Sequence, residues 1–72
     1  MPKTISGLEL VKFLTKKGFE IYTRKGSHVK LISISRSTKT IVPQHDELSV
    51  GTLNSILRQA KLTEEEIKEL LG

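Results

Sequence analysis

The chain has 72 residues, and its 12 basic and 8 acidic side chains give a net charge of +4 at pH 7. This length predicts a single small domain over residues 1–72 and excludes a dinucleotide-binding fold or a two-domain cleft enzyme. The absence of cysteine excludes disulfide frameworks, thiolate zinc sites and cysteine nucleophiles, and no apolar run exceeds two residues, so we expect a soluble cytoplasmic protein without a membrane span.

A first helix is predicted over about residues 7–17. Ser6 and Glu9 have the spacing of a capping box, in which each side chain accepts a hydrogen bond from the backbone N–H of the other residue. Gly18 provides a left-handed stop after the helix. The apolar positions that recur at helical spacing are Leu10, Val11, Phe13 and Leu14.

Three short strands are predicted next, as an antiparallel meander. Apolar and polar residues alternate with a period of two over 19–24, and a second strand is expected over about 28–34. A third strand over 38–42 ends at Pro43, because proline has no N–H to donate to a sheet. In the first strand the two predicted faces are Phe19, Ile21 and Thr23, and Glu20, Tyr22 and Arg24.

Two helices are predicted after the strands. Ser49 is a suitable N-cap for a second helix that ends near Lys61, and Thr63 and Glu66 repeat the capping-box spacing at the start of a short third helix. The order α-β-β-β-α with a short extra C-terminal helix predicts an α+β fold like that of double-stranded-RNA-binding domains. Such a fold places the helices on one face of a three-stranded antiparallel sheet and leaves the other face partly open.

Basic residues are concentrated in the first part of the chain. Residues 1–42 contain nine Lys or Arg and two Glu, whereas residues 43–72 contain three basic and six acidic residues. A polyanion would therefore meet the first part. An ordinary solvated basic surface would give the same excess, so composition does not decide between these interpretations.

The residues best suited to chemistry surround the predicted turn at Gly26 and Ser27. His28 follows this turn, and histidine can take and return a proton near neutral pH. A glycine turn lets a substrate approach and leaves backbone N–H groups to face an anion. This set suits attack of an RNA 2′-hydroxyl on its own phosphate, which needs no metal; the alternative is an ordinary strand histidine beside a turn. The cations that would attract phosphate are Arg24, Lys25 and Lys30.

Two other side chains are weaker candidates. His45 could form an acid/base pair with His28 or could cap the entry into the second helix, and we favour capping. Tyr22 is the aromatic residue with a face free for base stacking, since Phe13 and Phe19 are at core-type positions. No convergent set of carboxylates or histidines is apparent, so neither a metal site nor a cofactor is predicted.

Four segments, in the same order along the chain, resemble the HicA family of toxins, which are messenger-RNA interferases of bacterial and archaeal toxin–antitoxin pairs. Together they extend over nearly the whole chain, which makes the resemblance specific. The one departure is Lys61, which stands where glycine is expected before Leu62, the last residue of the fourth segment. The segments are Lys17-Gly18-Phe19, Arg24-Lys25-Gly26-Ser27-His28, Val42-Pro43-Gln44-His45 and residues 51–62.

The resemblance implies a function. It implies a metal-independent endoribonuclease that cleaves messenger RNA, with His28 as its catalytic residue, and a HicB antitoxin that binds the toxin and blocks this histidine. It also implies that Gly26 and Ser27 shape the turn that presents His28, and that Pro43 and His45 fix the loop beside it.

Two other functions stay open. A non-catalytic module of the same fold would bind RNA without cutting it, and an interaction protein would use its basic surface only for an acidic protein partner. His28 argues against the first, because double-stranded-RNA binders depend on lysines rather than a histidine at this place. We expect a monomer or small oligomer when the protein is free.

Overall fold

The computed structural model describes residues 4–72, so the first three residues of the predicted domain, Lys3 among them, lie outside the described residues. The observed order, α-β-β-β-α-α, confirms the predicted α+β fold. None of the helices in the described part of the chain is long and apolar enough to cross a membrane. The elements are α1 Gly7–Lys16, β1 Glu20–Lys25, β2 His28–Ser33, β3 Thr38–Pro43, α2 Val50–Gln59 and α3 Glu64–Leu71.

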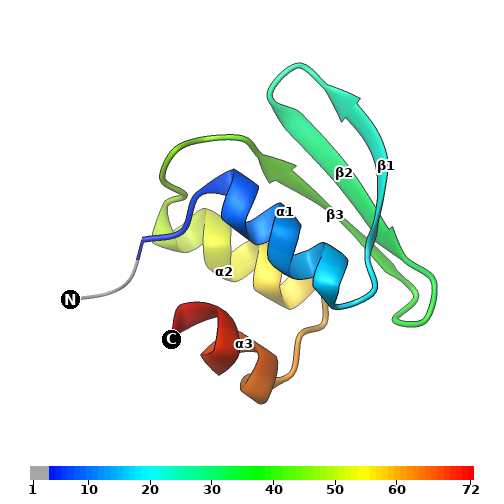
Figure 1. The fold of residues 1–72 in the computed structure, drawn as a ribbon, viewed down its shortest axis with the longest axis vertical. Helices are drawn as coiled ribbons and strands as arrows, with labels where there is room; N and C mark the ends of the chain where they lie inside the picture. Colours follow the sequence, from blue (N-terminus) through cyan, green and yellow to red (C-terminus); the bar gives the residue numbers. More distant parts are fainter. Residues whose placement is uncertain (1–3) are drawn as a thin grey trace.

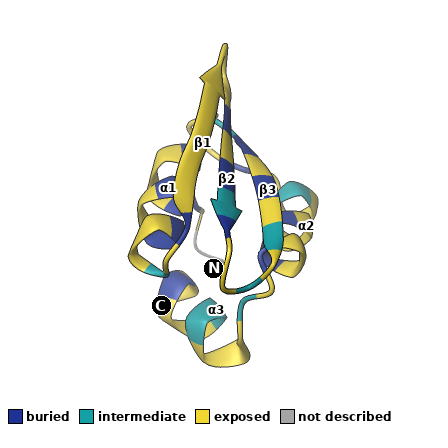
Figure 2. Ribbon diagram, turned by 90° about the vertical axis from the view of Figure 1, so that its right-hand side faces the viewer, coloured by how far each residue is buried: buried dark blue, intermediate teal, exposed yellow. Residues whose placement is uncertain are grey.

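The strands form one antiparallel sheet in the order β1-β2-β3. The helices cover one face of this sheet, and the opposite face, which Figure 2 shows toward the viewer, is open. Along β2, Val29 and Leu31 are buried under the helices while His28 and Lys30 are exposed. We call the uncovered side, which carries His28 and Lys30, the open face.

The first helix forms where the sequence predicts it. Ser6 and Glu9 make the complete capping box, with the Glu9 N–H donating to the Ser6 hydroxyl at 3.0 Å. After the helix, Gly18 has a φ of 95°, which glycine adopts without steric cost. The apolar stripe of α1 forms part of the core and consists of Leu10, Val11, Phe13 and Leu14.

The predicted faces of the first strand are wrong from Thr23 onward. A β-bulge lies between Ile21 and Thr23, and it shifts the register so that Thr23 pairs with Lys30. An extra residue in a strand reverses the alternation of the side chains that follow it. Arg24, which pairs with the buried Val29, therefore lies on the helical side of the sheet, although the regular alternation placed it with Tyr22.

The end of the second helix explains how a lysine replaces the expected glycine. Lys61 has a φ of 56°, in the left-handed region that favours glycine. Its ammonium group donates hydrogen bonds to the carbonyl oxygens of Arg36 and Ser37, at 3.1 and 3.5 Å. These contacts offset the strained backbone and connect the end of α2 to the β2–β3 turn.

Helix α3 is attached at the end of the molecule where β2 turns into β3. The Arg36 guanidinium makes a two-pronged contact with the Glu66 carboxylate, at 2.9 and 2.6 Å, and also donates to the Lys61 carbonyl oxygen at 3.2 Å. A second ion pair joins Lys17 to Glu69 at 2.8 Å. Bidentate Arg–carboxylate pairs are stronger than single contacts, so Arg36 is the main polar anchor of α3.

We predict that the Arg36–Glu66 contact makes the free energy of unfolding depend on pH in the acidic range. The hydrogen bonds from Arg36, and then that from the Thr63 N–H, lower the pKa of Glu66 from 4.5 to about 2. Because the pKa is lower in the folded state, the stabilisation is complete above about pH 4.5 and is lost as the pH falls toward 2. Glu66→Gln should cost about 1–2 kcal/mol at pH 7 in urea unfolding.

The difference in unfolding free energy between the parent and Glu66→Gln should shrink as the pH falls from about 5 to 2.5. When Arg36→Ala is present in both proteins, the stability difference between the Glu66 and Glu66→Gln forms should depend much less on pH. The reason is that the Arg36 hydrogen bond, the largest cause of the lowered Glu66 pKa, is then absent. A difference that is constant with pH would contradict the assignment.

Candidate functional site

A two-residue turn joins β1 to β2 and presents His28. Lys25 pairs with His28 across the strands, so Gly26 and Ser27 form the turn between them. Gly26 has a φ of 59°, and no atom lies within 4 Å of where its Cβ would be. Glycine is therefore favoured here by backbone conformation and not by lack of space.

His28 lies at the open face, at the end of the sheet near this turn. It alternates along β2 with the buried Val29, so the two side chains point to opposite faces. Its cross-strand neighbours are Lys25 on β1 and Pro43 on β3. His28 is exposed, and a substrate on the open face can reach it directly.

The loop after β3 is held against both the turn and the first helix. The Gln44 N–H donates to the Ser27 carbonyl oxygen at 2.6 Å, and the Gly7 N–H donates to the His45 carbonyl oxygen at 2.9 Å. The first hydrogen bond connects the loop to the turn. The second satisfies one of the N–H groups that have no partner within α1. The structure thus brings together the segments around His28 and Pro43 that the sequence analysis selected separately.

The hydrogen bond of His45 differs from the capping role that we favoured. The N-cap of α2 is Ser49, whose hydroxyl accepts from the Thr52 N–H at 3.2 Å. His45 instead contacts the start of α1 through its backbone carbonyl. The prediction that it caps α2 is therefore wrong, whereas a proton-transfer role for the exposed His45 stays a prediction.

Gly7 positions this loop and was missed by the sequence analysis. The residue is buried at the first position of α1. A Cβ at Gly7 would overlap the Pro43 carbonyl oxygen and would lie 2.9 Å from the Gln44 Cα. The available signal was a glycine directly after an N-cap, where the helix itself requires none.

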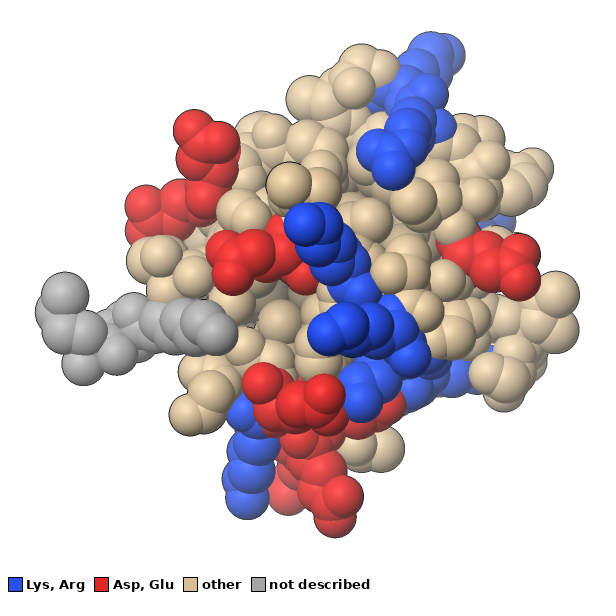
Figure 3. All heavy atoms as spheres, in the orientation of Figure 1, with Lys and Arg blue, Asp and Glu red and all other residues tan. Residues whose placement is uncertain are grey.

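The candidate cations lie near His28 but on two different faces. Lys25 and Lys30 share the open face with His28, whereas Arg24 lies on the helical side. All three are exposed, and the ion pairs found within residues 4–72 are those that anchor α3. Figure 3 shows basic side chains at the top of the molecule, where the β1–β2 turn lies in Figure 1, and mixed charges around α3. Positive charge near His28 is therefore free to meet an anion.

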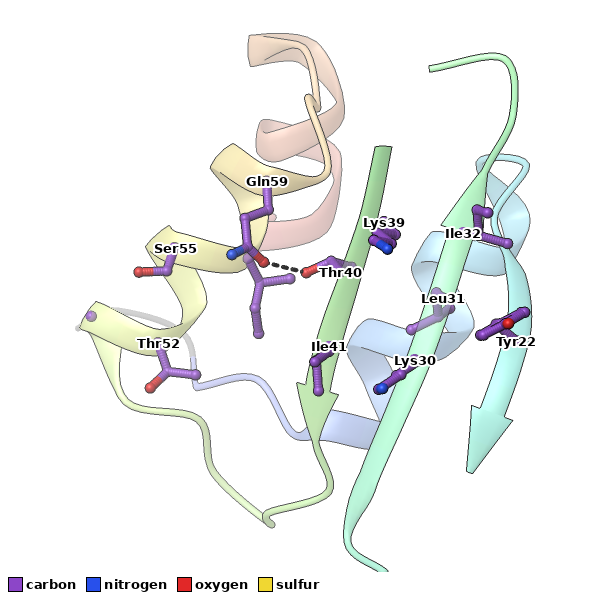
Figure 4. A pocket seen from close by; sticks show the side chains of 12 residues that line it. Tyr22, Lys30, Leu31, Ile32, Lys39, Thr40, Ile41, Thr52, Ser55 and Gln59 are labelled. Carbon is purple, nitrogen blue, oxygen red and sulfur yellow. Dashed lines mark hydrogen bonds between the residues drawn. The ribbon is translucent and has the colours of Figure 1, made fainter. Parts of the chain in front are cut away.

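A groove of about 990 Å³ opens between the sheet and α2. Figure 4 shows that its sheet side carries Tyr22 and Lys30, both of which the sequence analysis selected. The opposite side is formed by polar residues of α2 that were missed, although they recur at helical spacing within a segment that carries the family resemblance. These residues are Thr52, Ser55 and Gln59.

The residues around His28 have the chemistry to bind a phosphodiester and move a proton. Lys25 is the direct cross-strand neighbour of His28, and Lys30 follows two residues later, at about 7 Å along the strand. Their ammonium groups can stabilise phosphate charge while the imidazole exchanges a proton. Within residues 4–72, no three His, Cys, Asp or Glu residues form a group that could hold a metal ion.

The chain matches a known protein family over most of its length. A family model described as the HicA toxin of bacterial toxin–antitoxin systems matches residues 7–62. The matched range contains the turn before His28, the loop after β3 and all of α2, but not α3. Among curated proteins, no match to the chain was found.

Proposed function

The chain belongs to the HicA family, the toxins of bacterial toxin–antitoxin systems, and we propose that it is a cytoplasmic, metal-independent endoribonuclease that cleaves messenger RNA. The main support is the register of the sheet, which places His28, Lys25 and Lys30 together on the open face. An exposed imidazole beside two cations can promote attack of an RNA 2′-hydroxyl on the adjacent phosphate, since the nucleophile belongs to the substrate.

In the proposed reaction His28 acts as general base. Its imidazole takes the proton of a 2′-hydroxyl, the 2′-oxygen forms a bond to the adjacent phosphorus, and the bond from phosphorus to the 5′-oxygen breaks. The leaving 5′-oxygen takes a proton from the imidazolium, from His45 or from water. Lys25 and Lys30 stabilise the charge that develops on the phosphoryl oxygens. The products are a 2′,3′-cyclic phosphate and a free 5′-hydroxyl.

Incubating the purified chain with a long unstructured RNA in EDTA tests this function. Cleavage that yields cyclic phosphate and 5′-hydroxyl ends supports it. Binding without cleavage would instead support an RNA-binding module, and neither binding nor cleavage would leave the acidic-partner interpretation. A reaction that stops in EDTA and resumes with a divalent cation would contradict metal independence.

We also propose that a HicB antitoxin restrains the enzyme by covering His28. The proposal is supported by family membership and by the exposed, basic character of the site, because carboxylates compete directly with phosphate for such cations. A partner that bound only the helical side and left cleavage intact would contradict it.

A further inference from the structure

The groove between the sheet and α2 gives the open face a second feature besides His28. We propose that this groove binds a single-stranded RNA segment of the substrate, which continues from there to His28. This inference rests on the proposed ribonuclease function and extends it, because it names the form of RNA and the surface that holds it.

The groove is continuous with the proposed catalytic position. His28 and Lys30 lie two residues apart on the same face of β2, and Lys30 is part of the groove lining. Two residues of a strand advance by about 7 Å, which is within one nucleotide of the imidazole. An RNA segment bound in the groove can therefore extend along β2 to His28 without crossing another surface.

The charges in the groove fit phosphate. Lys30 and Lys39 are both in the lining, opposite Ile41 and Ile32 in the register, and no Asp or Glu is among the lining residues that the structure describes. The acidic residue that pairs into this face is Glu20, at the end of β1 away from His28. Two ammonium groups separated by an apolar floor match a chain of phosphates whose bases lie on the sheet.

Tyr22 supplies a surface for an unpaired base. The bulge in β1 places it beside Lys30 at the groove, and 70% of the residue is exposed. Figure 4 shows its ring across the sheet from the polar side chains of α2. The α2 wall is fixed by the Thr40 hydroxyl, which donates to the Gln59 side-chain oxygen at 2.8 Å. A flat face with a free ring can stack an unpaired base, whereas a duplex keeps its bases stacked inside and presents its backbone.

Binding measurements on the full chain carrying His28→Ala, in which we expect RNA cleavage to be slowed, can test the groove. The probe is a fluorescent RNA of about 12 nucleotides without self-complementarity, compared with its duplex by anisotropy. Tyr22→Ala should weaken binding of the single strand at least about fivefold, and Tyr22→Phe should restore it. Lys39→Ala should lower the slope of log affinity against log salt by about 0.7. The matched control is Lys12→Ala, an exposed lysine of α1, which should change neither quantity.

The outcomes separate the groove from the catalytic function. Parental affinity in both Tyr22→Ala and Lys39→Ala would overturn the groove even if the His28-containing chain cleaves RNA. The proposal would also be overturned if the duplex bound more tightly than the single strand and Lys12→Ala weakened that binding. A third contradicting outcome is that the groove variants keep RNA binding and lose only the binding of an acidic protein partner. If the groove variants weaken single-strand binding as expected but the chain with His28 does not cleave RNA, the groove is supported and the proposed ribonuclease function is contradicted.

Discussion

Replacing His28 with alanine is expected to reduce the rate of RNA cleavage by roughly 10²- to 10⁴-fold, because it removes the group that takes the proton from the 2′-hydroxyl. RNA affinity should change little, since Lys25, Lys30 and the groove remain. Single-turnover cleavage with enzyme in excess, in EDTA, measures the chemical step separately from product release, and anisotropy measures binding.

The fold of the His28→Ala variant should persist. His28 is exposed at the edge of a turn and contributes little to the core, so its melting temperature should lie within a few degrees of the parent value. His45→Ala should reduce the rate less, unless the two histidines exchange protons as a pair, in which case both losses would be large and non-additive. A folded His28→Ala variant that cuts RNA at the parental rate would rule out the general-base role.

Local signals in the sequence predicted the elements and their order. Both capping boxes form, at Ser6 and at Thr63, because the groups involved are three residues apart and need no tertiary partner. The turn at Gly26 is similarly local, since a positive φ is a property of one residue. The position of His28 at the start of a strand can therefore be predicted from the local sequence alone.

The features that sequence reasoning missed depend on tertiary contacts. The bulge after Ile21 is set by how β1 pairs with β2, and a regular alternation does not reveal it. The contact of His45 with Gly7 joins residues far apart in the chain, as does the groove between Tyr22 and α2. Each arises from packing two elements whose relative position is not encoded in either one.

Helix α3 stabilises the end of the molecule opposite His28. It lies outside residues 7–62, which match the family. Its ion pairs are with Lys17 and Arg36, and not with residues of the β1–β2 turn beside His28. Loss of the Arg36–Glu66 contact should therefore affect unfolding more than RNA cleavage at low temperature. This separation lets the acid-stability measurement and the cleavage assay report on different parts of the fold.

The second large effect is expected at Gly7. Gly7→Ala should destabilise the protein by about 1–3 kcal/mol, because the new methyl group would overlap the Pro43 carbonyl oxygen and crowd the Gln44 Cα. Alanine improves helix propensity by about 1 kcal/mol at most, so the clash with backbone atoms, which cannot rotate away, decides the sign. In a domain of this size the loss lowers the melting temperature by about 4–8 °C per kcal/mol.

Gly51→Ala is the matched control, because it makes the same substitution near the start of α2, where nothing lies within 4 Å of the added Cβ. It should leave stability unchanged or raise it by up to about 1 kcal/mol. Destabilisation of Gly7→Ala without destabilisation of Gly51→Ala, measured by urea unfolding, would confirm that α1 packs closely on the loop after β3. The folded fraction of Gly7→Ala should also cleave RNA more slowly, since that loop, through Gln44, holds the turn that presents His28. If Gly7→Ala were as stable as Gly51→Ala, the close packing that supports the site would be contradicted.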